Sequence, residues 1–245
     1  MKRAVLCALG FLLPTVIALR PAHAFVLDLN TPGSWGTING AVFQQFSDGG
    51  GGSGNIDAFV RVQANPVEQG YNTDYRPVQF DEDTSSTFNH SLLLSEVPTI
   101  TGGGITYREF LLDIDQSARY ISLDELEIYL EATGNIGLYP DNFTTLIYDL
   151  DAGEDSWIKL DYTINAGSGA GDMLAYIPDS YFQDEFGAYL NDYVYLYSKF
   201  GVNFAADNGF EEWAHGVGGP VIPEPASVFL LGLGGLLALR HRSKS

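Results

Sequence analysis

Apolar and polar residues alternate with a period of two over several stretches in the middle of the chain. The alternation runs through residues 59–62, 88–94, 158–164 and 193–200. In the last of these, Val194, Leu196 and Phe200 fall on one face, and Tyr193 is the first residue of the opposite face. Because successive side chains of a strand point to opposite faces, this pattern predicts strands with one buried face.

Glycine-rich turns separate the alternating stretches, at residues 48–54, 101–104, 133–135 and 166–171. Many short strands between such turns, without helices of ten or more residues, predict an all-β fold. We expect an antiparallel β-sandwich of jelly-roll type. The run at 48–54 lies well inside this region, so we interpret it as a hairpin loop and not as a domain boundary.

Two segments fit more than one element. Residues 122–125 resemble a helix capping box, and Leu123, Leu126 and Leu130 fit a helix face. Leu126, Ile128 and Leu130 fit a strand equally well, and we predict a strand because its neighbours are strands. Residues 179–187 are expected to form one short helix capped by Ser180, lying over a sheet edge.

The N-terminus has the three parts of a secretory signal peptide. Basic residues at positions 2 and 3 precede an apolar stretch over 4–19, and Ala22-His23-Ala24 supplies a small-residue cleavage site. We predict a signal helix and cleavage after Ala24. A retained membrane anchor is the alternative, but the apolar run is short for one.

The C-terminus combines Pro223-Glu224-Pro225 with an apolar run over 226–239 and a basic end from Arg240. As a helix that run spans about 21 Å, less than the roughly 30 Å of a bilayer core. We predict a short transmembrane helix with its basic end in the cytoplasm and the preceding domain outside. An ordinary single-pass anchor is the alternative.

The order of these three C-terminal parts resembles the PEP-CTERM sorting signal. The resemblance implies recognition of Pro223, Glu224 and Pro225 by an exosortase, a membrane-embedded cysteine transpeptidase that cuts near the motif. It also implies a Gram-negative bacterium that makes extracellular polysaccharide, and a protein delivered to the cell surface or matrix after transient anchoring in the inner membrane. The chain then divides into a signal peptide (1–24), an ectodomain (25–219) and a sorting signal (220–245).

Charge restricts the partners of the ectodomain. Residues 25–222 contain 6 basic and 30 acidic residues, a net charge of −24. Such a surface repels phosphate backbones and anionic membranes, so we exclude nucleic-acid binding. The single cysteine, Cys7, lies in the predicted leader, which leaves the mature protein without a disulfide or a thiolate.

Acidic residues at strand ends are the best candidates for a binding site. Asp113 and Asp115 close one apolar run, and Asp149 and Asp151 close another. Calcium needs several oxygen ligands and is abundant outside the cell, so these four aspartates predict a possible calcium site. The alternative is that they stabilise acidic turns; beyond calcium we expect no cofactor.

Aromatic residues offer a second candidate. Tyr193, Tyr195 and Tyr197 share one strand face, and Trp157 and Trp213 lie elsewhere in the ectodomain. An exposed row of rings suits carbohydrate binding, whereas three tyrosines on one face also pack inward. We favour inward packing, and keep an extracellular polysaccharide as a possible partner.

Catalytic signals are weak. The ectodomain has His90 and His215 as its only histidines, and it has no nucleophile-elbow motif. We therefore expect a protein without enzymatic activity, with a structural or adhesive role. A carbohydrate-binding module is the first alternative, and a secreted hydrolase that uses a carboxylate pair is the second.

Overall fold

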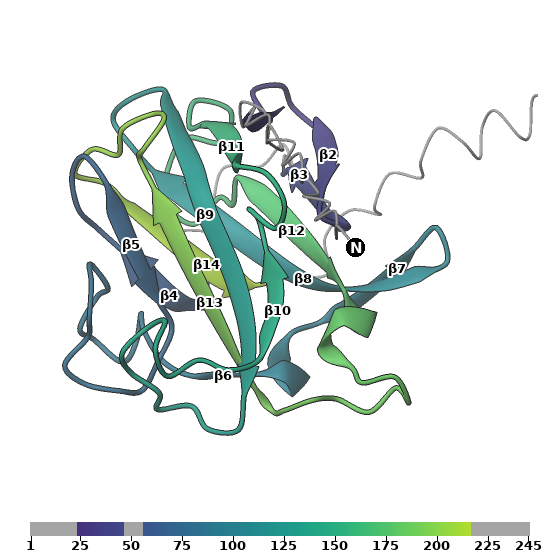
Figure 1. The fold of residues 1–245 in the computed structure, drawn as a ribbon. Helices are drawn as coiled ribbons and strands as arrows, with labels where there is room; N and C mark the ends of the chain where they lie inside the picture. The colour runs from purple at the N-terminus through teal and green to yellow at the C-terminus, as the bar shows by residue number, and fades with distance from the viewer. Residues whose placement is uncertain (1–23, 47–55, 217–245) are drawn as a thin grey trace, which may run out of the picture.

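The computed structural model describes residues 24–46 and 56–216. The predicted signal helix, the predicted C-terminal transmembrane helix and the glycine run at 48–54 lie outside these residues, apart from Ala24, which is exposed directly before the first strand. Strands dominate the described chain, and they form two sheets that face each other (Figure 1). The two-sheet, all-β architecture is confirmed, and its jelly-roll type stays a prediction.

The first sheet, sheet A, has seven strands in the order β1-β11-β9-β13-β5, with β10 paired to β9 and β6 to β13. Its pairs are antiparallel except for β1 with β11, which run parallel. The strands are β1 (Phe25–Asp28), β5 (Glu68–Tyr71), β6 (Leu92–Leu93), β9 (Tyr120–Glu131), β10 (Leu146–Asp149), β11 (Ser156–Asp161) and β13 (Tyr193–Phe200).

The second sheet, sheet B, has seven strands in the order β2-β3-β12-β8-β14-β4, with β7 paired to β8. Figure 1 shows the β7–β8 hairpin extending beyond the body of the sandwich. The strands are β2 (Trp35–Ile38), β3 (Ala41–Gln45), β4 (Ala58–Val62), β7 (Thr99–Gly102), β8 (Ile105–Asp115), β12 (Met173–Pro178) and β14 (Phe210–His215).

One hydrophobic core fills the space between the sheets. It is built from alternate residues of the long strands, such as Leu112 of β8, Ile128 of β9 and Leu196 of β13, all with no exposed surface. Trp213 of β14 lies fully inside this core, and its indole Nε1 donates to the Ser198 hydroxyl at 3.1 Å. Alternation in the sequence thus produces a two-layer core, because each strand turns one face inward.

The ambiguous segment at 122–130 is a strand, as predicted. It forms the middle of β9, which pairs with β11, β13 and β10 and is the longest strand of sheet A. Ser122 does not cap a helix; its hydroxyl donates to Asp124 and accepts from the backbone N–H of Phe204 at 2.9 Å. Pairing on both sides therefore decides between two patterns that the local sequence leaves equal.

Two local predictions are wrong. The alternating stretch at 88–94 is a strand only at Leu92–Leu93, because the N–H groups of Phe88 and Asn89 bond to the Ser85 carbonyl and close a turn. Residues 179–187 contain only a short 3₁₀ helix, η2 (Asp179–Phe182), and its N-cap position is Pro178 rather than Ser180. A second 3₁₀ turn, η1, spans Leu94–Glu96.

No helix within residues 24–46 and 56–216 has the length and apolar character needed to cross a membrane.

Candidate functional site

The predicted calcium ligands on β8 are engaged by the protein itself. The Asp113 carboxylate is buried and accepts backbone N–H groups from Gly169, Ala170 and Gly171 at 2.7, 3.0 and 2.8 Å. Burial raises the pKa of Asp113, and the three N–H donors oppose that rise by stabilising the carboxylate. Asp115 accepts from the Tyr162 hydroxyl at 3.3 Å.

The other two predicted ligands organise the turn after β10, in the opposite sheet. Asp149 accepts the N–H of Asp151 at 2.8 Å, and Asp151 accepts the N–H of Ser156 at the same distance. Burial is the main cause that raises the pKa of Asp151. The four aspartates thus serve two separate structural roles, and the chain does not bring them together as one set of ligands.

Across residues 24–46 and 56–216, no group of three or more His, Cys, Asp or Glu side chains is placed to hold a metal ion. The contacts of Asp149 and Asp151 are those of the acidic turns that the sequence allowed as the alternative.

The tyrosine row of β13 is covered and does not form an open platform. Tyr195 and Tyr197 are almost completely buried, and Tyr193 is half-buried. They belong to an aromatic cluster on the outer face of sheet A, which we call the tyrosine cluster. Its buried members and the residues packed on them are Tyr71, Tyr129, Tyr195, Tyr197, Phe80, Ile136, Tyr139, Phe143 and Tyr193.

Two loops provide the cover, one after β5 and one between β9 and β10. Tyr139 stacks on Tyr197 with ring centroids 4.1 Å apart, and Phe143 meets the edge of Tyr195 at 5.0 Å. The side chain of Gln79 joins the loops by donating to the Tyr139 carbonyl at 2.8 Å and accepting its N–H at 2.7 Å. The tyrosines therefore pack inward, as the sequence analysis favoured.

The two tryptophans are also parts of the packing. Trp213 is in the core between the sheets, and Trp157 is half-buried against the ring of Phe204 at 5.7 Å. Of the histidines, His90 is half-buried with its Nδ1 2.9 Å from the Ser91 carbonyl. These residues therefore stabilise the domain and present no row of free rings.

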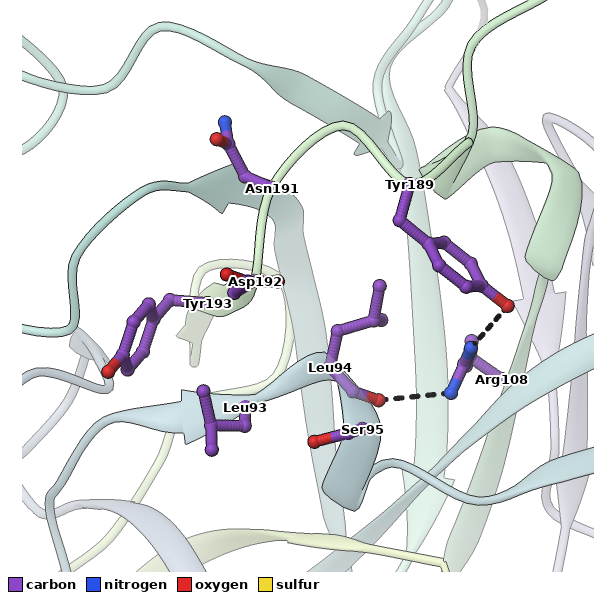
Figure 2. Close-up of a pocket in the computed structure, with 8 residues that line it drawn as sticks. All are labelled: Leu93, Leu94, Ser95, Arg108, Tyr189, Asn191, Asp192 and Tyr193. Carbon is purple, nitrogen blue, oxygen red and sulfur yellow. Dashed lines mark hydrogen bonds between the residues drawn. The ribbon is translucent and has the colours of Figure 1, made fainter. Parts of the chain in front are cut away.

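An open pocket lies at the end of the sandwich where η1 meets the segment before β13. Its volume is about 290 Å³. Figure 2 shows Tyr189 and Tyr193 on opposite sides of Leu94, with Arg108 beside Tyr189. The lining residues are Leu93, Leu94, Ser95, Arg108, Tyr189, Asn191, Asp192 and Tyr193.

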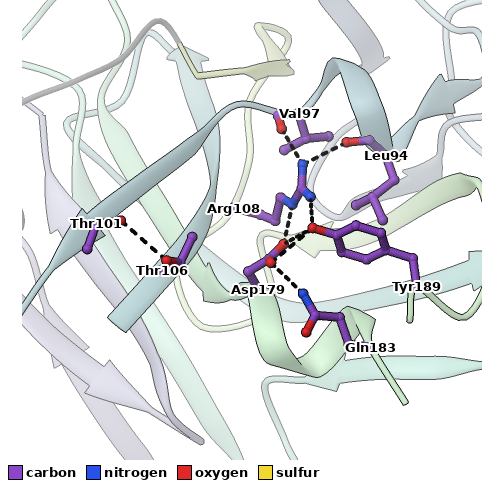
Figure 3. A network of polar contacts seen from close by, with 8 residues as sticks. All are labelled: Leu94, Val97, Thr101, Thr106, Arg108, Asp179, Gln183 and Tyr189. Carbon is purple, nitrogen blue, oxygen red and sulfur yellow. Dashed lines mark hydrogen bonds and ion pairs between the residues drawn. The ribbon is translucent and has the colours of Figure 1, made fainter. Parts of the chain in front are cut away.

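Arg108 fixes one wall of this pocket through a buried network (Figure 3). Its Nε donates to Asp179 at 2.6 Å, and Nη1 donates to the carbonyls of Leu94 and Val97 at 3.0 and 2.7 Å. Its Nη2 donates to the Tyr189 hydroxyl at 2.8 Å. That hydroxyl in turn lies 3.1 Å from the second carboxylate oxygen of Asp179. The ion pair thus joins β8, η1, η2 and the loop that carries Tyr189.

The sequence prediction did not include this pocket. Its residues come from three segments, 93–95, 108 and 189–193, that have no common motif. One signal was available: Arg108 is one of six basic residues in 25–222 and stands inside a strand that is otherwise largely apolar. A charge in such a position needs a buried partner, and Asp179 provides it.

The fold and these sites define a β-sandwich protein in which the predicted ligands and rings are used for packing. Residues 221–243 match the family model of the PEP-CTERM protein-sorting motif. The chain therefore carries this motif, which is the mark of an exported protein sorted by an exosortase. No curated protein and no solved structure matches the chain.

Proposed function

We propose that this protein, once sorted, is a structural or adhesive component of the cell surface or extracellular matrix. The observation that carries the proposal is the sorting motif at 221–243, which begins shortly after β14 ends at His215. A sandwich delivered outside the cell by such a signal is placed where a matrix component acts.

Charged and aromatic side chains that could bind a ligand are already engaged in contacts within the domain, and this supports a structural role. Arg61 lies between the rings of Phe88 and Phe210, 3.5 and 4.3 Å from their centroids, and its Nε donates to Glu212 at 2.6 Å. Asp113 and the tyrosine cluster are likewise occupied by internal contacts. Among the described residues, this pocket is lined by one carboxylate, that of Asp192, whereas glycosidic hydrolysis uses two, so this pocket does not support the hydrolase alternative.

Sorting is tested by replacing Pro223 and Pro225 together with alanine. Proline favours the extended backbone that a protease cleft requires, so we expect the double substitution to leave folding intact and to stop tail removal. Intact mass of the protein from cell-bound and medium fractions measures this. Pro220→Ala is the matched control, because Pro220 lies outside the matched residues and its loss should leave processing unchanged. A wild-type mass that extends to Ser245, found only in membranes, would mean a plain anchor.

The structural or adhesive role is tested in the native host by deleting the protein and measuring attachment to surfaces and cohesion of the matrix. We expect both to fall, and to recover with the wild-type chain but not with the double proline variant. Equal attachment and cohesion in the deleted and parent strains would refute the role while leaving the sorting result valid.

A further inference from the structure

The pocket beside Arg108 has the size and the mixture of groups of a small binding site. At about 290 Å³ it lies at the lower end of the range for ligand pockets, so it holds one ring and not a long chain. It is open to solvent at Tyr189, which is 49% exposed, and at Asp192, also exposed. A ring that is one unit of a longer polymer can therefore enter while the rest stays outside.

Several polar groups that line the pocket have donors or acceptors still free to bond a ligand. Asn191 uses its amide nitrogen on the Leu130 carbonyl at 3.1 Å, which leaves its amide oxygen as an acceptor. The Ser95 hydroxyl and the Asp192 carboxylate have no hydrogen bond within the described part of the chain. Arg108 retains a second N–H on Nη2 after its bond to Tyr189. Donors and acceptors are thus both offered, as hydroxyl groups require.

Aromatic surface accompanies these polar groups. Tyr189 and Tyr193 lie on opposite sides of the pocket, with the aliphatic side chains of Leu93 and Leu94 between them (Figure 2). The Tyr189 hydroxyl is held by Arg108 and Asp179, which fixes the ring before any ligand binds. A fixed ring next to free hydrogen-bonding groups suits a ligand with an apolar face and a hydroxylated edge.

Charge decides which such ligand fits. Arg108 is neutralised by Asp179 at 2.6 Å, so the Asp192 carboxylate gives the pocket an unpaired negative charge. The chain as a whole carries −19, which further disfavours phosphate or uronate ligands. The remaining Nη2 N–H of Arg108 needs a hydrogen-bond acceptor, which a sugar hydroxyl supplies and an ammonium group, with donors only, does not. We infer that the pocket binds a single uncharged sugar residue, either free or as part of a polysaccharide.

This inference goes beyond the structural or adhesive role and does not depend on it. The test uses the mature protein purified from its host, and measures binding to neutral hexose, N-acetylhexosamine and hexuronate oligosaccharides by saturation-transfer NMR. We expect at least one neutral oligosaccharide to bind and the hexuronates to bind more weakly. Tyr189→Ala and Asp192→Ala are each expected to weaken binding about tenfold, as the loss of one ring or one polar contact does.

Phe186→Ala is the matched control. Phe186 is 86% exposed on the same loop and does not line the pocket, so its removal should leave binding unchanged. The Asp192 side chain makes no hydrogen bond to residues 24–46 or 56–216, and its replacement keeps the test valid even where Tyr189→Ala disturbs the loop. Absence of binding to every neutral oligosaccharide, preference for hexuronates, or equal losses in the Phe186 and Tyr189 variants would overturn the inference. None of these results bears on sorting or adhesion.

Discussion

One buried carboxyl group, that of Glu68, is expected to make the stability of the domain depend on pH. Glu68 of β5 has no exposed surface, its Oε2 accepts the N–H of Ala64 at 2.8 Å, and its Oε1 has no partner among the described residues. Burial, aided by the charges of Asp81 and Asp207, raises its pKa from 4.5 to about 8. The folded protein therefore binds this proton more tightly than the unfolded chain does.

We predict that Glu68→Gln flattens the pH dependence of stability. The contribution of Glu68 is complete below about pH 4.5 and is lost as pH rises through about 8, a change of at most about 5 kcal/mol. Urea unfolding of the wild type at pH 5, 7 and 9 should show falling stability, and the glutamine variant should lose less across the same range. Parallel curves for the two proteins would show that another group is responsible.

At the residue scale, the sequence indicated which side chains share a face but not what covers them. The alternation at 193–200 correctly places Tyr195 opposite Leu196. Tyr139, which stacks on Tyr197, comes from a loop about sixty positions away, and no local pattern links the two. Burial of this face is a tertiary property, so the choice between an open and a covered tyrosine row required the fold.

At the scale of elements, the two loops over sheet A are joined to each other by the hydrogen bonds between Gln79 and Tyr139, and Phe143 packs one of them on the sheet. Phe143 is only half-buried, yet it contacts the rings of Tyr71, Tyr129 and Tyr195 at 5.4, 5.2 and 5.0 Å. Its ring therefore covers part of the outer surface of the tyrosine cluster.

We predict that Phe143→Ala lowers the free energy of unfolding by about 3 kcal/mol and makes the tyrosines more accessible. Urea unfolding gives the first quantity, and near-ultraviolet circular dichroism reports the second through loss of fixed aromatic packing. Phe186→Ala, at a phenylalanine that is 86% exposed, should change neither. Equal effects of the two substitutions would show that the loops do not cover the cluster in solution.

An alternating stretch of this chain forms a full strand only where a neighbouring strand is available to pair with it. Residues 193–200 form β13 between β9 and β5, and its register with β9 extends along most of both strands. The stretch at 88–94 has an equally good alternation, but a turn at Ser85 leaves only Leu92–Leu93 in position to pair. Alternation thus predicts which face is buried, whereas the availability of a neighbour decides whether a strand forms.

For the whole molecule, the separation of the predicted calcium ligands leads to a simple expectation. Asp113 and Asp115 belong to sheet B, and Asp149 and Asp151 to sheet A and the turn that follows. We predict that thermal unfolding of the mature protein is the same with excess calcium and with a chelator. A rise of several degrees in the melting temperature with calcium would show that the folded protein binds calcium, since a ligand that binds the folded state stabilises that state.

The sorting signal was far easier to predict from the sequence than the pocket was. Pro223, Glu224 and Pro225 are contiguous, so the motif is complete within a short stretch of sequence. The pocket is the opposite case, because Arg108 and Tyr189 meet only after β8, η1 and η2 have packed. Local sequence therefore specifies delivery, and the fold specifies the binding surface.

The position of β14 determines how the domain responds to mechanical tension. Tension applied at His215 acts on β14, an interior strand hydrogen-bonded to β8 on one side and β4 on the other. Those bonds run across the strand direction, so a pull along β14 strains them together instead of one after another. Among the described strands β1 pairs with β11 alone, at the edge of sheet A, so force applied at Phe25 should detach β1 first.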